Sequence, residues 1–482
     1  MSSVSNILSV AALGPALFAS VTAGAAHRRC AGSPSQTAGF AVATPETSAI
    51  LIASSAVKSS NASYSAATGR PQHTAATGKA SATLTGLAAA AGTSTAASAL
   101  ASSTATASPD DYSSWTVSAI DALQNWYDED EGLWLSTGWW NAANCLTMLG
   151  DFYAADASDA ESLDISAIFS NTYTQAQTSD SSSKVRRKTL PRVHAVPGAG
   201  PARGVSSGLS HLAERGFAGF LDDYYDDDGW WALAWIRAYD VTGTTEYLAM
   251  AESIFSTMET GVDDTCGGGI WWSTDDTYKN AIANELYLAV AASLANRASS
   301  AETYLSIAEG QWAWFQNSGM INSDNLINDG LTINSDGTCT NNGETTWSYN
   351  QGVILGGLLE LYKANGNASL VTEATTIAEA AIDALSVDGI LHESCEDSGC
   401  GGDVPQFKGI FMRNLQALQL QVESDSFRTF ILDNADSIWN NDRNSSSYLG
   451  TNWSGPADSA GSPIASMQCS ALDALVAAVA VY

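Results

Sequence analysis

Apolar residues recur at three- and four-residue steps along most of the chain after residue 115, and this spacing predicts α-helices. One such run contains Trp231, Ala234 and Ala238, and another contains Leu286 and Val290. Twelve helical patterns of this kind follow one another in alternating pairs. No alternation of apolar and polar residues typical of strands extends as far, so the sequence predicts an all-α fold.

The loops between these predicted helices alternate in length. Most loops that lead into an even-numbered helix are long, whereas the loops that leave one are short, as at 240–244, 363–367 and 422–425. Long loops on one face and short loops on the other are what a ring of six helical hairpins would produce. We therefore expect an (α/α)6 barrel, with functional groups on the long-loop face, because loops carry function while helices supply the scaffold.

The composition divides the chain into three parts. Residues 1–25 combine an apolar stretch with small residues at 23–25, which is typical of a secretory signal peptide, and a disordered Ala-rich terminus is the alternative. Residues 26–109 consist mainly of Ser, Thr, Ala and Gly without Trp, so they cannot offset their ordering entropy and are predicted to form a disordered stalk. Residues 110–482 are long enough to form the closed helical domain.

The charge of the chain limits its partners. Asp and Glu total 51 against 20 Lys and Arg, which gives a formal net charge of −31. Nucleic acid and anionic polysaccharide are poor partners for such a chain, whereas a neutral substrate fits. The N-terminal apolar stretch is shorter than the ~20 residues of a membrane span. No hydrophobic tail follows the last predicted helix, so we expect a secreted monomer, extracellular or associated with a cell wall, without a lipid anchor.

Six of the seven cysteines fall in the predicted helical domain, and in a secreted chain they are expected to form disulfides. Cys395 and Cys400 are close enough in sequence to form a local pair. No spacing typical of a zinc site is present, so we expect no metal. The other four allow three pairings that the sequence cannot rank, and they are Cys145, Cys266, Cys339 and Cys469.

Residues 184–216 differ from the rest of the domain. They contain seven of the twenty basic residues but only one acidic residue, Glu214. This basic segment stands directly before an aspartate cluster, where a short loop would be expected. We interpret it either as a translated intron or as a genuine basic loop.

The aspartate cluster consists of Asp226, Asp227 and Asp228, with two tyrosines before it and Trp230 and Trp231 after it. Negative charge is favourable at the start of a helix, so these aspartates could simply cap one. Aromatic rings beside carboxylates also suit a sugar, whose C–H faces stack on rings while its hydroxyls bind acids and amides. Glycoside hydrolysis needs two carboxyl groups, one ionised and one protonated, and neighbouring carboxylates raise one another's pKa.

Five motifs carry a resemblance to a known family. Residues 226–231, 266–272, 279–284, 347–352 and 407–411 resemble, in order, the signatures of glycoside hydrolase family 76, whose members are endo-α-1,6-mannanases. The resemblance covers about 110–482 apart from the basic insert. It implies an (α/α)6 barrel, a retaining mechanism and no cofactor.

The resemblance also implies roles for particular residues. Asp226 corresponds to the nucleophile and Asp227 to the acid/base, while a shift of one residue would give Asp227 and Asp228 instead. The expected substrate-binding residues are Trp230, Trp231, Trp271, Trp272, Asn284, Tyr349, Asn350 and Lys408. For each of them a structural role is the alternative: aromatic packing for the rings, bridges between helices for the amides, and a salt bridge for Lys408 and for Lys279.

Three functions are therefore open at this point. The first is endo-hydrolysis of the α-1,6-mannosidic bonds of fungal cell-wall mannan, with a neutral α-mannan polysaccharide or oligosaccharide as partner. The second is cell-wall transglycosylation by the same catalytic pair. The third is a wall protein that binds carbohydrate without turning it over.

Overall fold

The computed structural model describes residues 107–177, 217–457 and 463–482. The predicted signal peptide, nearly all of the predicted stalk and the whole basic segment at 184–216 lie outside these residues. The described residues belong to a compact unit that runs from Ala99 to Tyr482.

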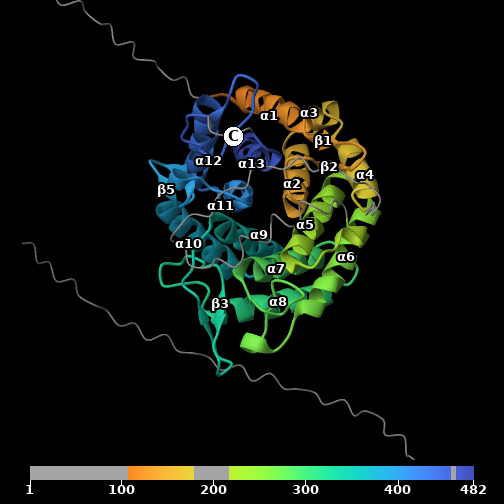
Figure 1. Ribbon diagram of the computed structural model, residues 1–482, viewed down its shortest axis with the longest axis vertical. Coiled ribbons are helices and arrows are strands. Elements are labelled where there is room, and N and C mark those ends of the chain that lie inside the picture. The colour runs from red at the N-terminus through yellow and green to blue at the C-terminus, as the bar shows by residue number, and fades with distance from the viewer. Residues whose placement is uncertain (1–106, 178–216, 458–462) are drawn as a thin grey trace, which may run out of the picture. The chain divides into compact units, whose positions relative to one another are not determined.

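Most of the described chain is α-helical, and the helices form two concentric layers (Figure 1). The inner layer consists of α2 (Trp139–Ala155), α5 (Tyr225–Thr242), α7 (Ala281–Ala295), α9 (Ser348–Asn365), α11 (Phe407–Val422) and α13 (Ala465–Val481). The outer layer consists of α1 (Pro109–Gln124), α3 (Ala157–Ser162), α4 (Ile165–Gln175), α6 (Thr245–Met258), α8 (Ala301–Ser318), α10 (Ala368–Leu385) and α12 (Asp425–Ser437). The two short helices α3 and α4 together occupy one outer position.

The inner helices contact one another in chain order, and α13 returns to contact α2. This closed ring of six helices is an (α/α)6 barrel, as the sequence predicts. It also explains why α7 and α13 are apolar nearly all round, since each packs against two inner neighbours and an outer helix. The even-numbered helices of the sequence pattern are the inner ones.

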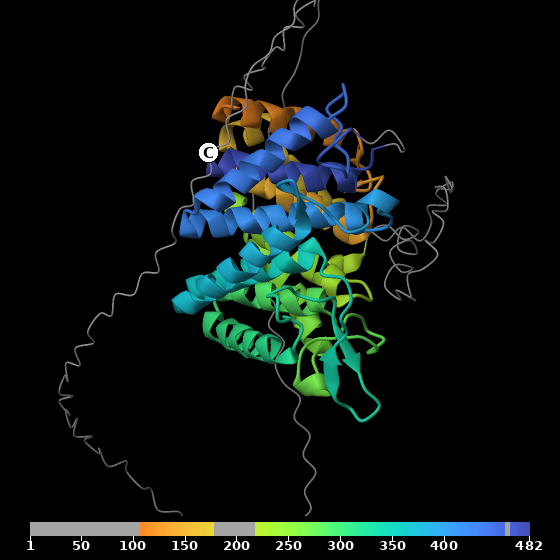
Figure 2. The ribbon, with the colours of Figure 1, turned by 90° about the vertical axis from the view of Figure 1, so that its left-hand side faces the viewer.

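The two ends of the barrel differ as expected. Short turns join α5 to α6 and α9 to α10, where Gly243 and Gly366 adopt left-handed φ angles of 70° and 71° that end each inner helix. The opposite end carries long connections, which project on the right of Figure 2. Three of them contain small antiparallel hairpins: β1 (Tyr127–Asp128) with β2 (Leu133–Trp134), β3 (Leu331–Ile333) with β4 (Cys339–Asn341), and β5 (Ser386–Val387) with β6 (Ile390–Leu391).

Small residues bring the inner helices into backbone contact. A Cβ atom on Gly352 of α9 would lie 2.6 Å from the Cα of Phe411 on α11, and one on Gly409 of α11 would lie 2.5 Å from the Cα of Ser470 on α13. A larger side chain at either position would push two inner helices apart. The packing of the ring therefore depends on these glycines.

Three disulfides form within the described residues. The predicted local pair Cys395–Cys400 is confirmed. Of the pairings that the sequence left open, the structure selects Cys145–Cys469 and Cys266–Cys339. Among the helices that the structure describes, none is both long and apolar enough to cross a membrane.

Candidate active site

The aspartate cluster lies in the first turn of α5, at the long-loop end of the barrel. A short antiparallel pairing fixes where this helix begins. The backbone N–H of Tyr225 donates to the carbonyl oxygen of Trp272 over 3.0 Å, and the N–H of Thr274 donates to that of Asp223 over 3.0 Å. The loop that carries Trp271 and Trp272 is therefore docked on the residues that lead into α5.

Asp226 receives a side-chain hydrogen bond from this loop. The indole Nε1 of Trp272 donates to its Oδ2 over 3.0 Å, whereas its Oδ1 has no hydrogen-bond partner among the described residues. Burial raises the pKa of Asp226 to about 7, the bond from Trp272 opposes that rise, and the charge of Asp222 adds to it. One oxygen of Asp226 thus accepts a side-chain hydrogen bond, whereas the other is buried and accepts none among the described residues.

Asp227 has a different environment. Its side chain is buried, and its pKa is raised well above the usual value, first by burial and then by the charges of Asp222 and Asp226. A hydrogen bond with Asp222 and the charge of Asp403 raise the pKa further. Two adjacent carboxyl groups, one with an N–H donor and one surrounded by other carboxylates, have the asymmetry that separates an ionised carboxylate from a protonated acid.

Asp228 differs from both neighbours. It is fully buried, and its Oδ1 accepts the backbone N–H of Asp222 over 3.1 Å. The N-cap of α5 is Tyr224, which makes no side-chain capping bond. The prediction that Asp228 caps the helix is therefore wrong, because its carboxyl group accepts the backbone N–H of Asp222 in the segment that precedes α5.

Asp222 and Asp403 are candidate site residues that the sequence analysis missed. Asp403 lies before α11, and its Oδ1 accepts a hydrogen bond of 3.2 Å from Nε1 of Trp140 on α2. The ring of Trp140 in turn stacks on Trp230, with centroids 5.6 Å apart. The only sequence signal for Asp403 is its place in a long loop that leads into an inner helix.

Aromatic residues from further inner helices lie beside this cluster. Tyr349 of α9 stacks on Phe407 of α11, with centroids 3.9 Å apart and planes 5° apart. Trp140 lies 6.3 Å from the same Phe407 ring. Burial raises the pKa of Tyr349 strongly, and the charges of Asp329 and Asp226 contribute to the rise. The starts of α2, α5, α9 and α11 thus contribute neighbouring rings.

Three of the four predicted sugar-binding tryptophans lie in the protein interior. Trp231 is fully buried between Trp139 and Phe220, with ring centroids 4.6 and 4.7 Å away. Trp271 is 6% exposed, and the ammonium nitrogen of Lys279 lies 4.8 Å from its ring centroid. Trp230 is 4% exposed and stacks on Trp140, so all three have the contacts of packing residues, whereas Trp272 is only partly buried.

The predicted polar binding residues are also placed in the interior. The Asn284 amide donates to the carbonyls of Ile270 and Asn280, and its Oδ1 accepts from the N–H of Ile270 and from Gln311. Asn350 is fully buried, and neither atom of its amide has a hydrogen-bond partner among the described residues. Asn284 thus bridges a loop to two helices, as its structural alternative required.

Both buried lysines form salt bridges. The ammonium nitrogen of Lys408 lies 2.7 Å from Oε1 of Glu396 and donates to the carbonyls of Leu391 and Thr451. The same nitrogen lies 4.4 Å from the ring centroid of Trp453. Lys279 lies 2.7 Å from Asp263. Among the described residues, no group of three or more His, Cys, Asp or Glu side chains has the arrangement of a metal site.

Comparisons with known proteins agree on one family. The family model described as Glycosyl hydrolase family 76 matches residues 217–481. The mannan endo-1,6-alpha-mannosidase DFG5 of Saccharomyces cerevisiae is 35% identical over 207 residues, which are 39% of this chain and 44% of that protein. The protein of the same name from Candida albicans is 27% identical over 58% of this chain and 57% of its own length. The chain thus spans about half the length of these curated relatives.

Solved structures share the fold. An inactive variant of the alpha-1,6-mannanase GH76A of Salegentibacter sp. HEL1_6, in complex with alpha-1,6-mannotriose, has a TM-score of 0.61 at 21% identity, covering 77% of this chain and 100% of that one. Dfg5 from Chaetomium thermophilum, in complex with glucosamine, has a TM-score of 0.60 at 17% identity, covering 78% of this chain and 92% of that one.

Proposed function

The chain belongs to glycoside hydrolase family 76, and from this premise we propose that it is a retaining endo-glycosidase acting on α-1,6-mannosidic bonds. The observation that carries the proposal is the unequal environment of two adjacent carboxyl groups at the start of α5. Asp226 accepts an indole N–H, whereas Asp227 is buried beside Asp222, Asp226 and Asp403. We assign Asp226 as the nucleophile and Asp227 as the acid/base.

These roles give a balanced two-step reaction. An oxygen of Asp226 attacks the anomeric carbon while Asp227 donates its proton to the glycosidic oxygen, so that the C–O bond breaks and the shortened chain leaves. Asp227, now ionised, takes a proton from water, and the resulting hydroxide displaces Asp226 from the anomeric carbon. The configuration is inverted twice and therefore retained, and Asp227 ends protonated as it began.

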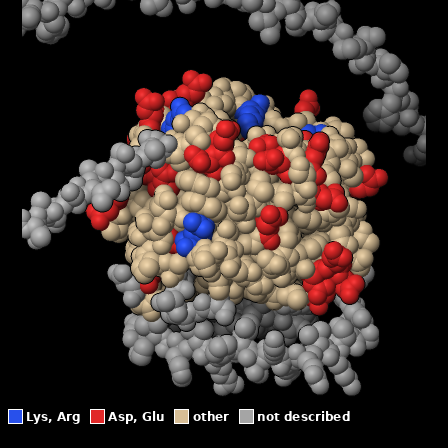
Figure 3. Space-filling view, turned by 90° about the horizontal axis from the view of Figure 1, so that it is seen from above, with Lys and Arg blue, Asp and Glu red and all other residues tan. Residues whose placement is uncertain are grey.

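The substrate class rests on charge and on the relatives. Asp and Glu are far more common than Lys and Arg on the face seen from above (Figure 3), as they are in the whole sequence. Because an acidic surface repels anions, this excess favours a neutral polymer over an anionic one as the substrate. The yeast relatives are named for mannan, and the Salegentibacter complex holds alpha-1,6-mannotriose. That inactive variant carries asparagine at two consecutive aspartates, which supports a catalytic pair of adjacent residues here. The residues expected to bind the sugar are Trp272 and Tyr349, which are partly exposed.

The expected location follows from the disulfides. Three disulfides within the described residues are typical of proteins that fold in an oxidising compartment. We infer that the protein is secreted and acts outside the cell, at or near the wall.

The test is incubation of the full chain with linear α-1,6-mannan, with and without an added mannoside acceptor. We expect shorter oligosaccharides whose newly formed reducing ends are initially α, as NMR would show. Elongated products on addition of acceptor would identify transfer to a sugar hydroxyl, the second candidate, as the main activity. Binding of mannan without any new reducing ends or transfer products would contradict the proposal and leave a carbohydrate-binding wall protein.

A further inference from the structure

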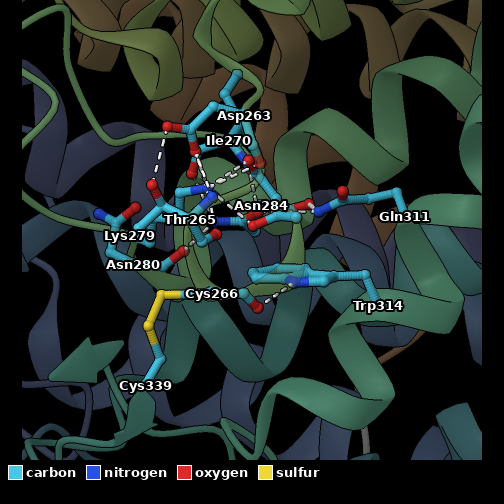
Figure 4. Close-up of polar contacts among 12 residues, drawn as sticks. Asp263, Thr265, Cys266, Ile270, Lys279, Asn280, Asn284, Gln311, Trp314 and Cys339 are labelled. Atoms are coloured by element: carbon cyan, nitrogen blue, oxygen red, sulfur yellow. Dashed lines mark hydrogen bonds and ion pairs between the residues drawn. A yellow bond between two sulfur atoms is a disulfide. The ribbon is translucent and has the colours of Figure 1, made fainter. Parts of the chain in front are cut away.

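The ammonium group of Lys279 lies inside a loop that folds around it (Figure 4). The Lys279 side chain has no exposed surface. Its nitrogen lies within hydrogen-bonding distance of five oxygen atoms, all from one segment: Oδ1 of Asp263 at 2.7 Å, and the carbonyls of Thr265 at 2.8 Å, Gly268 at 2.8 Å, Gly269 at 2.9 Å and Asp263 at 3.3 Å. Carbonyls that converge on one cation are held in a fixed arrangement, as they are around a bound metal ion.

The far side of this loop is closed by Trp314 of α8. A Cβ atom on Gly269, where φ is +81°, would lie 2.4 Å from the Trp314 ring, so only glycine fits there. The indole Nε1 of Trp314 donates to the carbonyl of Cys266 over 3.1 Å, and Cys266 is joined to Cys339 by a disulfide. The loop is therefore fixed from both sides (Figure 4).

The loop continues through Ile270 to Trp272, which forms a hydrogen bond with Asp226. The backbone N–H of Ile270 donates to Oδ1 of Asn284, and the carbonyl oxygen of Ile270 accepts a hydrogen bond from the Asn284 amide nitrogen. Trp272 then donates its backbone N–H to the carbonyl of Tyr278 over 2.8 Å, and Tyr278 is the neighbour of Lys279 in the sequence. With its backbone held in this way, Trp272 places its indole N–H 3.0 Å from Oδ2 of Asp226.

We propose that Trp272 is a positioning residue that keeps the Asp226 carboxylate ionised and aligned as the nucleophile, and that the Lys279 ammonium holds Trp272 in place through the loop folded around it. This inference rests on the proposed function, because it takes Asp226 as the nucleophile. It gives the tryptophan a role beyond stacking on a sugar and gives the buried lysine a role in catalysis without contact with the substrate.

The physical reason is the preference of an anion for a fixed donor. An N–H that bonds to a carboxylate stabilises the charged form and lowers its pKa. In this protein burial raises the pKa of Asp226, and the Trp272 bond is the largest effect that opposes it. Removing the donor should therefore raise the pH at which Asp226 ionises.

The test is the pH profile of kcat/KM for Trp272→Phe, which keeps a ring but removes the donor. We expect the acidic limb to move to higher pH by about one unit, and kcat to fall about tenfold or more. Trp439→Phe, which removes an indole that stacks on Trp115 of the outer helix α1, is the control and should leave the limb in place. If the rate of Trp272→Phe is too low to profile, carbon NMR of labelled aspartate would report the same shift directly.

The role of Lys279 is tested by a double-mutant cycle. Lys279→Met should move the acidic limb in the same direction as Trp272→Phe but add little when Trp272 is already Phe, because both act through one bond. Asp263→Asn, which changes an exposed partner of Lys279, is the milder variant if Lys279→Met does not fold. Lys363→Met on the surface is the control.

The outcomes separate the two proposals. An acidic limb that stays in place in an active Trp272→Phe would overturn this inference and leave the catalytic pair standing. Fully additive shifts in the cycle would overturn the role of Lys279 alone. Near-normal turnover by Asp226→Asn would instead contradict the proposed function itself.

Discussion

Cys145 and Cys469 join the first inner helix, α2, to the last, α13, across 324 residues of sequence. Both sulfur atoms are fully buried. The bond therefore closes covalently the same ring that helix packing closes by contact. Nothing else in the described chain connects residues so far apart in the sequence by a disulfide.

We predict that this disulfide contributes more to stability than the local one. Replacing Cys145 and Cys469 together by Ala should lower the free energy of unfolding by roughly 2–5 kcal/mol, because the closed loop is long. The matched control is the double replacement of Cys395 and Cys400, which close a loop with a sequence separation of 5. Denaturant unfolding measures both, and an equal or larger loss in the control would contradict the prediction.

Burial raises the pKa of the acid Asp227 most, and Asp403 should add to that rise. Its negative charge disfavours ionisation of Asp227 and so raises the pKa of Asp227. In Asp403→Asn that pKa should fall, and the alkaline limb of the rate profile, which reports the protonated acid, should move to lower pH. Asp433→Asn on the outer helix α12 should leave it in place. An alkaline limb that stays fixed or moves to higher pH in Asp403→Asn would refute this role.

Lys408 should be structural. Its side chain is 2% exposed and pairs with Glu396, which also lies 3.1 Å from His392, so Lys408→Met removes the ammonium partner of a buried carboxylate and should cost roughly 3–5 kcal/mol of unfolding free energy. Lys363 pairs with Glu360 at the surface, and Lys363→Met should cost at most about 1 kcal/mol. Thermal unfolding of the two variants gives the comparison, and similar melting temperatures would argue against the structural role.

Glu285 should make stability depend on pH. Its carboxyl group is fully buried without a hydrogen-bond partner among the described residues, and burial raises its pKa well above 4.5. The folded state therefore holds a proton that the unfolded state releases, so stability is lost as pH rises above the unfolded pKa.

Glu285→Gln should remove this dependence. We expect its melting temperature to exceed that of the wild type at pH 8 and to match it near pH 4. Exposed Glu423→Gln is the control and should change neither value. A variant that is destabilised equally at both pH values would contradict a neutral, buried Glu285.

The sequence was sufficient for the architecture because the relevant signals are local or periodic. The three- and four-residue spacing of apolar residues predicted the helices, and the alternation of long and short loops predicted the ring of six hairpins. Cys395 and Cys400 could be paired because they are close in sequence. Cys145 and Cys469 could not, since their proximity exists only once the ring has closed.

The side-chain contacts of the candidate site could be predicted only in part. Asp226 and Asp227 stand out in the sequence, but Asp403 approaches them only through the folding of a distant loop. Lys408 and Asn284 have the residue types and positions of sugar ligands, yet carbonyl groups and side chains of neighbouring loops occupy their polar atoms. Which partner a buried polar group finds depends on loop conformation, which periodicity does not encode.

The central claim is the assignment of Asp226 as nucleophile and Asp227 as acid/base, and azide rescue tests it most directly. Asp226→Ala and Asp227→Ala would each be incubated with an activated aryl α-1,6-mannobioside and sodium azide, and the glycosyl azide examined by NMR. Without the nucleophile, azide displaces the leaving group once, so Asp226→Ala should give the β-azide. Without the acid/base, azide opens the glycosyl-enzyme, so Asp227→Ala should give the α-azide. A β-azide from Asp227→Ala would contradict the assignment and make Asp227 the nucleophile.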